Sequence, residues 1–156
     1  MRATQSINQM TAIKKYDADH RTIRVDYNLS ASPEKVWRAL TEPNLLERWL
    51  FPNDIVPRVG QPFTFHTMPA PGFDGLIQCQ ITEAEPARRL VYSWRSGPLD
   101  TVVTWGLEPT SAASTRLSLT HEGFGPQDGD IYQLLEKGWG ERSAGLLEGM
   151  IPSLSQ

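Results

Sequence analysis

The feature of this 156-residue sequence that most limits its fold is a change of hydrophobic period near residue 124. Before that point, apolar and polar residues alternate in a series of short runs, as in strands with one buried face. After it, apolar residues recur at helical spacing over some twenty residues. A sheet with one apolar face must be covered, and this last segment is the one long helix that the pattern predicts.

Six runs show the alternation, and turns rich in proline, glycine and serine separate most of them, which favours antiparallel neighbours. Their apolar members are Ile23, Val25, Tyr27 and Leu29; Phe63 and Phe65; Ile77, Cys79 and Ile81; Leu90, Tyr92 and Trp94; Val103, Trp105 and Leu107; and Leu117 and Leu119. Between the first two runs, Ser32 and Pro33 predict the start of a short helix, and Pro43 that of a second. The fold class is therefore expected to be α+β.

The closing helix should present one stripe of residues to the sheet: Ile131, Leu134, Leu135, Gly138, Trp139, Arg142, Leu146 and Met150. It also contains four glycines, each of which costs about 1 kcal/mol relative to alanine in a helix. They are Gly138, Gly140, Gly145 and Gly149. Such glycines remove volume between helix and sheet, either for close packing of the backbone or for a cavity. The residues alone leave both interpretations open.

Composition excludes several classes of protein. The single cysteine, Cys79, cannot form an intrachain disulfide or a multi-cysteine metal site. A net charge of −3 does not favour a nucleic-acid binder, and no apolar run is long enough to span a membrane. We expect a cytoplasmic protein with a flexible lead-in over residues 1–20 and a single domain over residues 21–156.

Several segments occur in an order and spacing that resemble one known family. They are Ala31–Thr41 (ASPEKVWRALT), Leu46–Trp49 (LERW), Val59–Gly60, Arg89–Trp94 (RLVYSW), Thr115–Phe124 (TRLSLTHEGF) and Gly138–Trp139. Together they resemble the activator of Hsp90 ATPase homologue family of the START-like, Bet v 1-like (SRPBCC) superfamily. The resemblance covers residues 21–151. It implies a helix-grip fold, in which a curved antiparallel sheet wraps around a long C-terminal helix and leaves a hydrophobic cavity between them.

Motifs for hydrolytic nucleophiles and for phosphate binding are absent from the sequence, so no catalytic residue, cofactor or metal is assigned. Two residues are weak candidates for acid/base chemistry. His121 has the parity of Leu117 and Leu119, so its ring should face the core, either as a structural histidine or as a proton-transferring group. Tyr92 shares the parity of Leu90 and Trp94 and could supply a phenol to the same space.

The aromatic residues give the stronger signal, because apolar walls with a few polar groups suit a lipid-, steroid- or polyketide-like ligand. The candidate ligand-binding residues are Trp49, Phe51, Phe63, Phe65, Ile77, Cys79, Tyr92, Trp94, Trp105, His121, Trp139 and Arg142. The alternative is that the rings simply fill the interior. Arg142 has two interpretations of its own, a contact with an acidic group of the ligand or a salt bridge at the rim.

Three hypotheses about function follow. The first is a non-enzymatic protein that binds a small hydrophobic ligand, with a homodimer left open. The second is an enzyme of the polyketide cyclase or hydrolase type on the same scaffold. The third is a module that interacts with a chaperone ATPase. We favour it least, because the chain has no room for the separate chaperone-binding domain of the eukaryotic co-chaperones in the family.

Overall fold

The computed structural model describes residues 12–15 and 21–154. Its strands are β1 (Ala12–Lys15), β2 (Thr22–Leu29), β3 (Pro62–His66), β4 (Leu76–Glu85), β5 (Arg89–Ser96), β6 (Leu99–Ser111) and β7 (Ser114–Glu122). They form one antiparallel sheet in the order β1-β2-β7-β6-β5-β4-β3. The six strands predicted from the alternating runs are confirmed. Most of the predicted lead-in, residues 1–20, lies outside the described residues; within it, β1 pairs with β2 and was not predicted.

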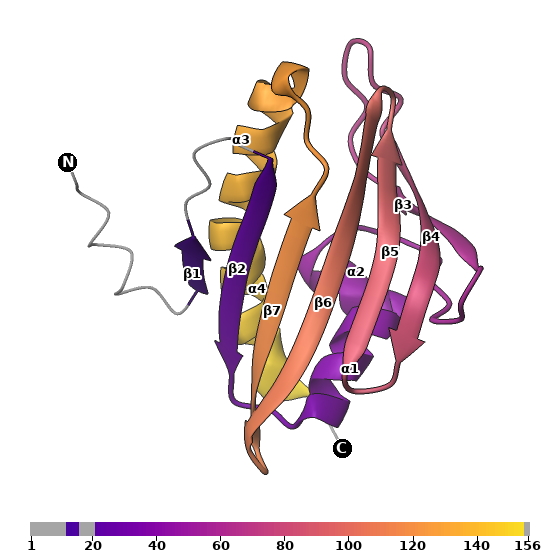
Figure 1. Cartoon of the computed structure of the whole chain (residues 1–156). Coiled ribbons are helices and arrows are strands. Elements are labelled where there is room, and N and C mark those ends of the chain that lie inside the picture. The colour runs from indigo at the N-terminus through magenta and orange to yellow at the C-terminus, as the bar shows by residue number, and fades with distance from the viewer. Residues whose placement is uncertain (1–11, 16–20, 155–156) are drawn as a thin grey trace, which may run out of the picture.

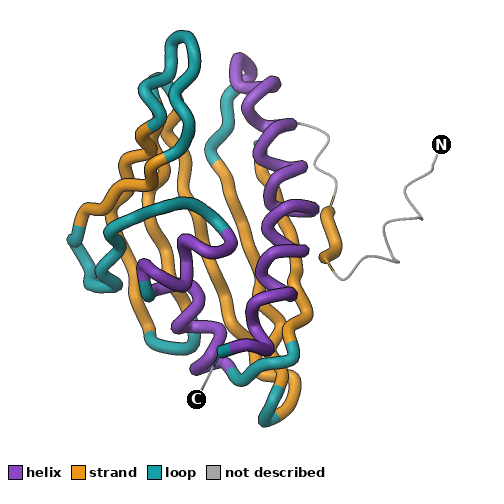
Figure 2. The backbone as a smooth tube through the Cα atoms, turned by 180° about the vertical axis from the view of Figure 1, so that it is seen from behind, coloured by secondary structure: helices purple, strands orange, loops and turns teal. Residues whose placement is uncertain are grey.

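The sheet curves around three helical elements that all lie on one side of it (Figures 1 and 2). The buried residues of neighbouring strands lie side by side in rows, because the strands pair in register. Tyr27 lies opposite Leu117, and Leu117 lies opposite Leu107. Because side chains alternate along each strand, one face of the sheet is built from buried residues such as Val103 and Trp105, both 0% exposed.

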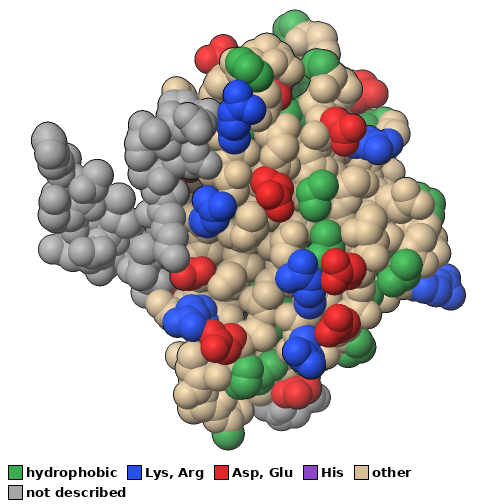
Figure 3. Space-filling model, in the orientation of Figure 1, with side chains coloured by type: hydrophobic (Ala, Val, Ile, Leu, Met, Phe, Trp, Pro, Cys, Tyr) green, Lys and Arg blue, Asp and Glu red, His purple; other side chains and the backbone are tan. Residues whose placement is uncertain are grey.

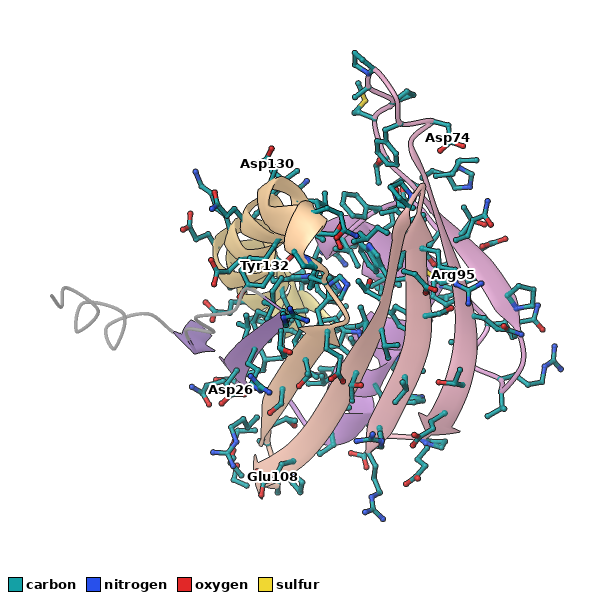
Figure 4. All side chains as sticks on the ribbon, turned by 45° about the horizontal axis from the view of Figure 1, so that its top comes forward. Asp26, Asp74, Arg95, Glu108, Asp130 and Tyr132 are labelled. Carbon is teal, nitrogen blue, oxygen red and sulfur yellow. The ribbon has the colours of Figure 1, made fainter. Side chains whose placement is uncertain are left out.

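The outer face of the sheet carries the charged residues that alternate with this core. In Figure 4, Asp26, Glu108 and Arg95 lie on the outer side, whereas Tyr132 lies on the helix side. Acidic and basic side chains are mixed over this face rather than gathered by sign (Figure 3). Some of them form exposed pairs, such as Arg95 with Asp100 at 3.1 Å. Such pairs contribute about 1 kcal/mol at most.

The two short helices begin where the sequence predicts, α1 at Pro33 (Pro33–Thr41) and α2 at Pro43 (Pro43–Trp49). The Oγ of Ser32 caps α1 by accepting a hydrogen bond from the backbone N–H of Lys35 at 3.3 Å. In α2, Leu45, Leu46 and Trp49 are buried. The two helices therefore close one end of the apolar face of the sheet.

The C-terminal helix is continuous but irregular. It comprises η2 (Pro126–Asp128), α3 (Gly129–Lys137), a π turn η3 (Gly138–Arg142), α4 (Ser143–Met150) and η4 (Ile151–Ser153). In the π turn the N–H of Ser143 bonds to the carbonyl of Gly138, five residues back. A helical turn with one extra residue rotates everything that follows it about the axis. The predicted stripe is therefore wrong in part: Leu146 is 41% exposed, whereas Leu147 is fully buried.

Leu134 also departs from the predicted stripe, since it is 67% exposed on α3.

Close packing does not explain three of the helix glycines, because a Cβ at Gly138, Gly145 or Gly149 would meet nothing within 4 Å. A curved, open antiparallel sheet wrapped around a long C-terminal helix, with two short helices after the first long strand, is the α+β helix-grip fold expected from the sequence. In the described part of the chain, no helix is both long enough and apolar enough to cross a membrane.

Candidate functional site

An apolar pocket of about 270 Å³ opens between the C-terminal helix and the segment that follows α2. It is lined by Leu50, Phe51, Trp94, Leu134, Leu135, Gly138, Trp139, Arg142 and Ser143. Arg142 and Ser143 are the polar members of this set. The irregular part of the helix supplies most of the helical wall, because Gly138, Trp139 and Arg142 belong to the π turn and Ser143 follows it directly.

Two tryptophan rings join the pocket to the core. Trp94 comes from β5 and Trp139 from the π turn, and their ring centroids lie 5.6 Å apart at an interplanar angle of 61°. Both are almost completely buried. Behind them, Trp139 contacts Trp105 at 5.5 Å, and Trp105 contacts Trp49 at 5.8 Å, both edge to face. Edge-to-face contact is one of the favoured arrangements of aromatic rings, so the wall of the pocket is continuous with the packed core.

A chain of buried hydrogen bonds fixes the same two tryptophans. The indole Nε1 of Trp139 donates to Nδ1 of His121 at 3.2 Å. Because an indole N–H can only donate, Nδ1 is an acceptor and the neutral ring carries its proton on Nε2. That nitrogen lies 2.8 Å from Oγ1 of Thr101, which in turn donates to the backbone carbonyl of Trp94 at 2.9 Å. His121 therefore connects the two walls of the pocket.

Burial determines the protonation of this histidine. His121 is completely buried, and desolvation lowers its pKa to about 3 from the usual 6.5. Both ring nitrogens are already hydrogen-bonded to protein. The ring is thus neutral and has no nitrogen free for a substrate, so its geometry is that of a structural residue.

Tyr92, the other acid/base candidate, is equally enclosed. Its phenol accepts a hydrogen bond from Nε1 of Trp105 at 3.0 Å, and burial raises its pKa well above the ordinary value. Tyr92 pairs with Val103, and Val103 pairs with His121, so strand β6 separates the two candidates by about 10 Å at the backbone. The two groups do not meet at one reacting atom.

The π turn has a partner of its own on the sheet. Oη of Tyr27, on β2, donates to the backbone carbonyl of Trp139 at 2.7 Å. Both residues are buried, so this bond is shielded from water. It ties the irregular part of the helix to the sheet and holds Trp139 at the pocket. A π turn in a long helix is often found at a functional site.

The family of the chain follows from its sequence as a whole. A family model described as activator of Hsp90 ATPase homolog 1-like protein matches residues 30–148. The chain belongs to this family. No curated protein matches it at a significant level.

Solved structures of similar proteins share the fold of this family member. A protein from Mesorhizobium loti is 34% identical, with a TM-score of 0.76 over 87% of this chain and 100% of its own. DynU16, a protein of the dynemicin biosynthetic locus, is 22% identical, with a TM-score of 0.71 over 85% of this chain and 48% of its own. An HSP90 activator from Plasmodium falciparum is 18% identical, with a TM-score of 0.70 over 85% of this chain and 96% of its own.

The sequence proposes twelve residues for ligand binding. In the structure they fall into two groups. Four line the apolar pocket: Phe51, Trp94, Trp139 and Arg142. The other eight lie in the core: Trp49, Phe63, Phe65, Ile77, Cys79, Tyr92, Trp105 and His121. In this second group the rings contact one another, as Phe63 does with Tyr92 at 5.0 Å. Cys79 is a buried free thiol whose pKa is raised, chiefly by burial.

Sequence reasoning missed several residues of the site. Thr101 has the parity of Val103 and Trp105 on β6, so the alternation could have placed it in the core. Ser143 lies four residues after Trp139, so helical spacing could have placed it on the same face. Among the described residues, no group of three or more histidine, cysteine, aspartate or glutamate side chains could hold a metal ion.

Proposed function

We propose that this protein binds a small hydrophobic ligand in the apolar pocket that Trp94 and Trp139 line, between the C-terminal helix and the segment that follows α2. The observation that carries the proposal is an apolar opening of about 270 Å³ whose wall is held in place by buried hydrogen bonds. Concave apolar sites with a few polar groups are the usual form of a small-molecule site. A wall that is already ordered loses little conformational entropy when a ligand binds.

The size of the pocket limits what enters it. A water molecule takes about 30 Å³ in the liquid, so about 270 Å³ holds on the order of ten non-hydrogen atoms. That is an alkyl chain of about eight carbons, or the ring end of a larger lipid-, steroid- or polyketide-like molecule. Leu134, exposed at the mouth, would contact the part that remains outside. The occurrence of DynU16 in a biosynthetic locus is compatible with a small organic ligand.

A second candidate function comes from the description of the family and from the Plasmodium protein, an HSP90 activator that shares the fold. In this alternative, the chain is a module that interacts with a chaperone ATPase. Stimulation of the ATPase of a purified Hsp90 by this chain would support the alternative. Unchanged ATPase turnover at saturating protein would count against it.

The test of ligand binding uses two glycines of the C-terminal helix. Gly138 lines the pocket and Gly145 is exposed farther along the helix, and a Cβ at either position meets nothing within 4 Å. Gly138→Leu should fill the pocket, whereas Gly145→Leu is the matched control. Tryptophan fluorescence is titrated with 1-octanol, octanoate and 2-naphthol.

We expect saturable binding of at least one of these probes to the unmodified protein and to Gly145→Leu. Gly138→Leu should weaken it at least tenfold. The proposal is overturned if none of the probes binds, or if Gly138→Leu and Gly145→Leu bind them equally well.

A further inference from the structure

Three hydrogen-bond donors that line the apolar pocket have no acceptor among the described residues. They are the indole N–H of Trp94, the hydroxyl of Ser143 and the guanidinium of Arg142. The other buried tryptophans all donate: Trp49 to the carbonyl of Ala39, Trp105 to Tyr92 and Trp139 to His121. Among the buried tryptophans, Trp94 alone thus lacks an acceptor in the described part of the chain, and it lines the pocket, where Arg142 is exposed.

Trp94 and Ser143 are enclosed, with exposed fractions of only 1% and 3%. A polar atom in such a position is normally hydrogen-bonded, because leaving it unpaired away from water is unfavourable. In the described part of the chain, the one side-chain nitrogen or oxygen that is both fully buried and unpaired is Oε2 of Glu148. The donor atoms of Trp94 and Ser143 must therefore retain some access to solvent. The pocket that both residues line supplies it.

Arg142 adds a charge to this set. It forms no ion pair with another described residue, so the salt bridge at the rim that the sequence allows is absent from the described part of the chain. The guanidinium of arginine and the N–H of an indole can donate hydrogen bonds but cannot accept them. A group that satisfies them must therefore be an acceptor, and the positive charge favours an anion.

We propose that the ligand of this pocket is a carboxylate with an apolar tail, and that Arg142, Ser143 and Trp94 donate hydrogen bonds to its carboxylate group. This inference rests on the proposed function, since it names the class of ligand for the same pocket. The apolar wall formed by Leu50, Leu135 and Trp139 would take the tail. A tail of about eight carbons fits the volume.

The experiment compares octanoate with 1-octanol, which have the same chain length and differ in the head group. A carboxylate is hydrated far more strongly than an alcohol, so a pocket that recognises only the tail would bind 1-octanol more tightly. Affinities are measured by isothermal titration calorimetry for the unmodified protein, Arg142→Gln and Ser143→Ala. Lys137→Gln is the control, because it removes an exposed positive charge from the same helix outside the pocket.

We expect octanoate to bind more tightly than 1-octanol. Arg142→Gln should weaken octanoate about tenfold and Ser143→Ala severalfold, while the affinity for 1-octanol stays the same in both variants. Lys137→Gln should leave both affinities unchanged.

Binding of 1-octanol as tight as that of octanoate, or an equal loss for octanoate in Arg142→Gln and Lys137→Gln, would overturn the carboxylate inference and leave the proposed function standing. Failure of both octanoate and 1-octanol to bind would overturn the carboxylate inference and would count against the proposed function as well.

Discussion

The indole Nε1 of Trp139 donates a hydrogen bond to Nδ1 of His121, 3.2 Å away, and joins the wall of the apolar pocket to the core of the sheet. The bond fixes the tautomer of the imidazole, so its Nε2–H is directed to Thr101. The histidine that the sequence singles out as an acid/base candidate thus has a positioning role. Four predictions test this arrangement and the helix that carries it.

Loss of the buried hydrogen bonds should destabilise the protein. His121→Phe keeps a ring but leaves the indole N–H of Trp139 without its acceptor and removes the hydrogen bond that the Thr101 hydroxyl accepts, which should lower the free energy of unfolding by about 2–4 kcal/mol. Thr101→Val should cost about 1–3 kcal/mol. Urea denaturation measures both. The double variant should lose less than the sum of the two, since the residues share one bond; strict additivity would contradict the network.

The stability should fall in acid because of His121. Its pKa is lowered to about 3 in the folded chain and is 6.5 in the unfolded chain, so between these values the unfolded state binds a proton that the folded state excludes. The contribution of His121 to the free energy of unfolding therefore falls by about 1.4 kcal/mol for each pH unit below 6.5 and levels off near pH 3.

Urea denaturation of the unmodified protein and of His121→Gln, at pH values from 8 to 4, isolates this effect. The difference in stability between the two should be constant above pH 7 and shrink as the pH falls. A difference that stays constant down to pH 4 would mean that the histidine is not held neutral.

The hydrogen bond from Tyr27 to the π turn should also contribute to stability. Tyr27→Phe removes the donor and leaves the buried carbonyl of Trp139 without this partner, so the free energy of unfolding should fall by about 1–2 kcal/mol. Thermal or urea unfolding checks the value. An unchanged midpoint and slope would show that the carbonyl finds another donor at no cost.

Replacing a glycine by alanine should affect stability in opposite directions in the C-terminal helix and in a turn. Gly138→Ala and Gly145→Ala each place a methyl group in open space on a helix and should raise the free energy of unfolding by about 0.5–1 kcal/mol. Gly75→Ala should lower it, because φ is +85° and the new Cβ would lie 2.7 Å from the carbonyl oxygen of Thr67. Chemical denaturation of the three variants tests this order. An equal effect at all three positions would contradict the described backbone.

The sheet could be predicted almost completely from the sequence. Its period of two is unambiguous where one face is buried, so the inward direction of Tyr92, Trp94 and His121 followed from their neighbours alone. The helix could be predicted only in part. A π turn leaves no mark on the spacing of apolar residues before it, and here it moved the buried face from Leu146 to Leu147.

The position of the site is the least predictable part. Period identifies which side chains point inward, but it does not say which of the inward spaces are filled. Trp49, Phe63 and Trp105 fill the core by contact between rings, whereas Trp94 and Trp139 also face an opening. That difference depends on packing between elements far apart in the sequence, and no local pattern encodes it.

The most direct test of ligand binding at this pocket is the indole region of a ¹H–¹⁵N correlation spectrum during titration with octanoate, with peaks assigned from tryptophan-to-phenylalanine variants. The chain has five tryptophans, and Trp94 and Trp139 line the pocket. We expect their two indole N–H resonances to shift in a saturable way, Trp94 most because its N–H gains an acceptor, while that of Trp37 on α1 stays in place. Shifts absent from both Trp94 and Trp139, or confined to Trp37, would contradict the account.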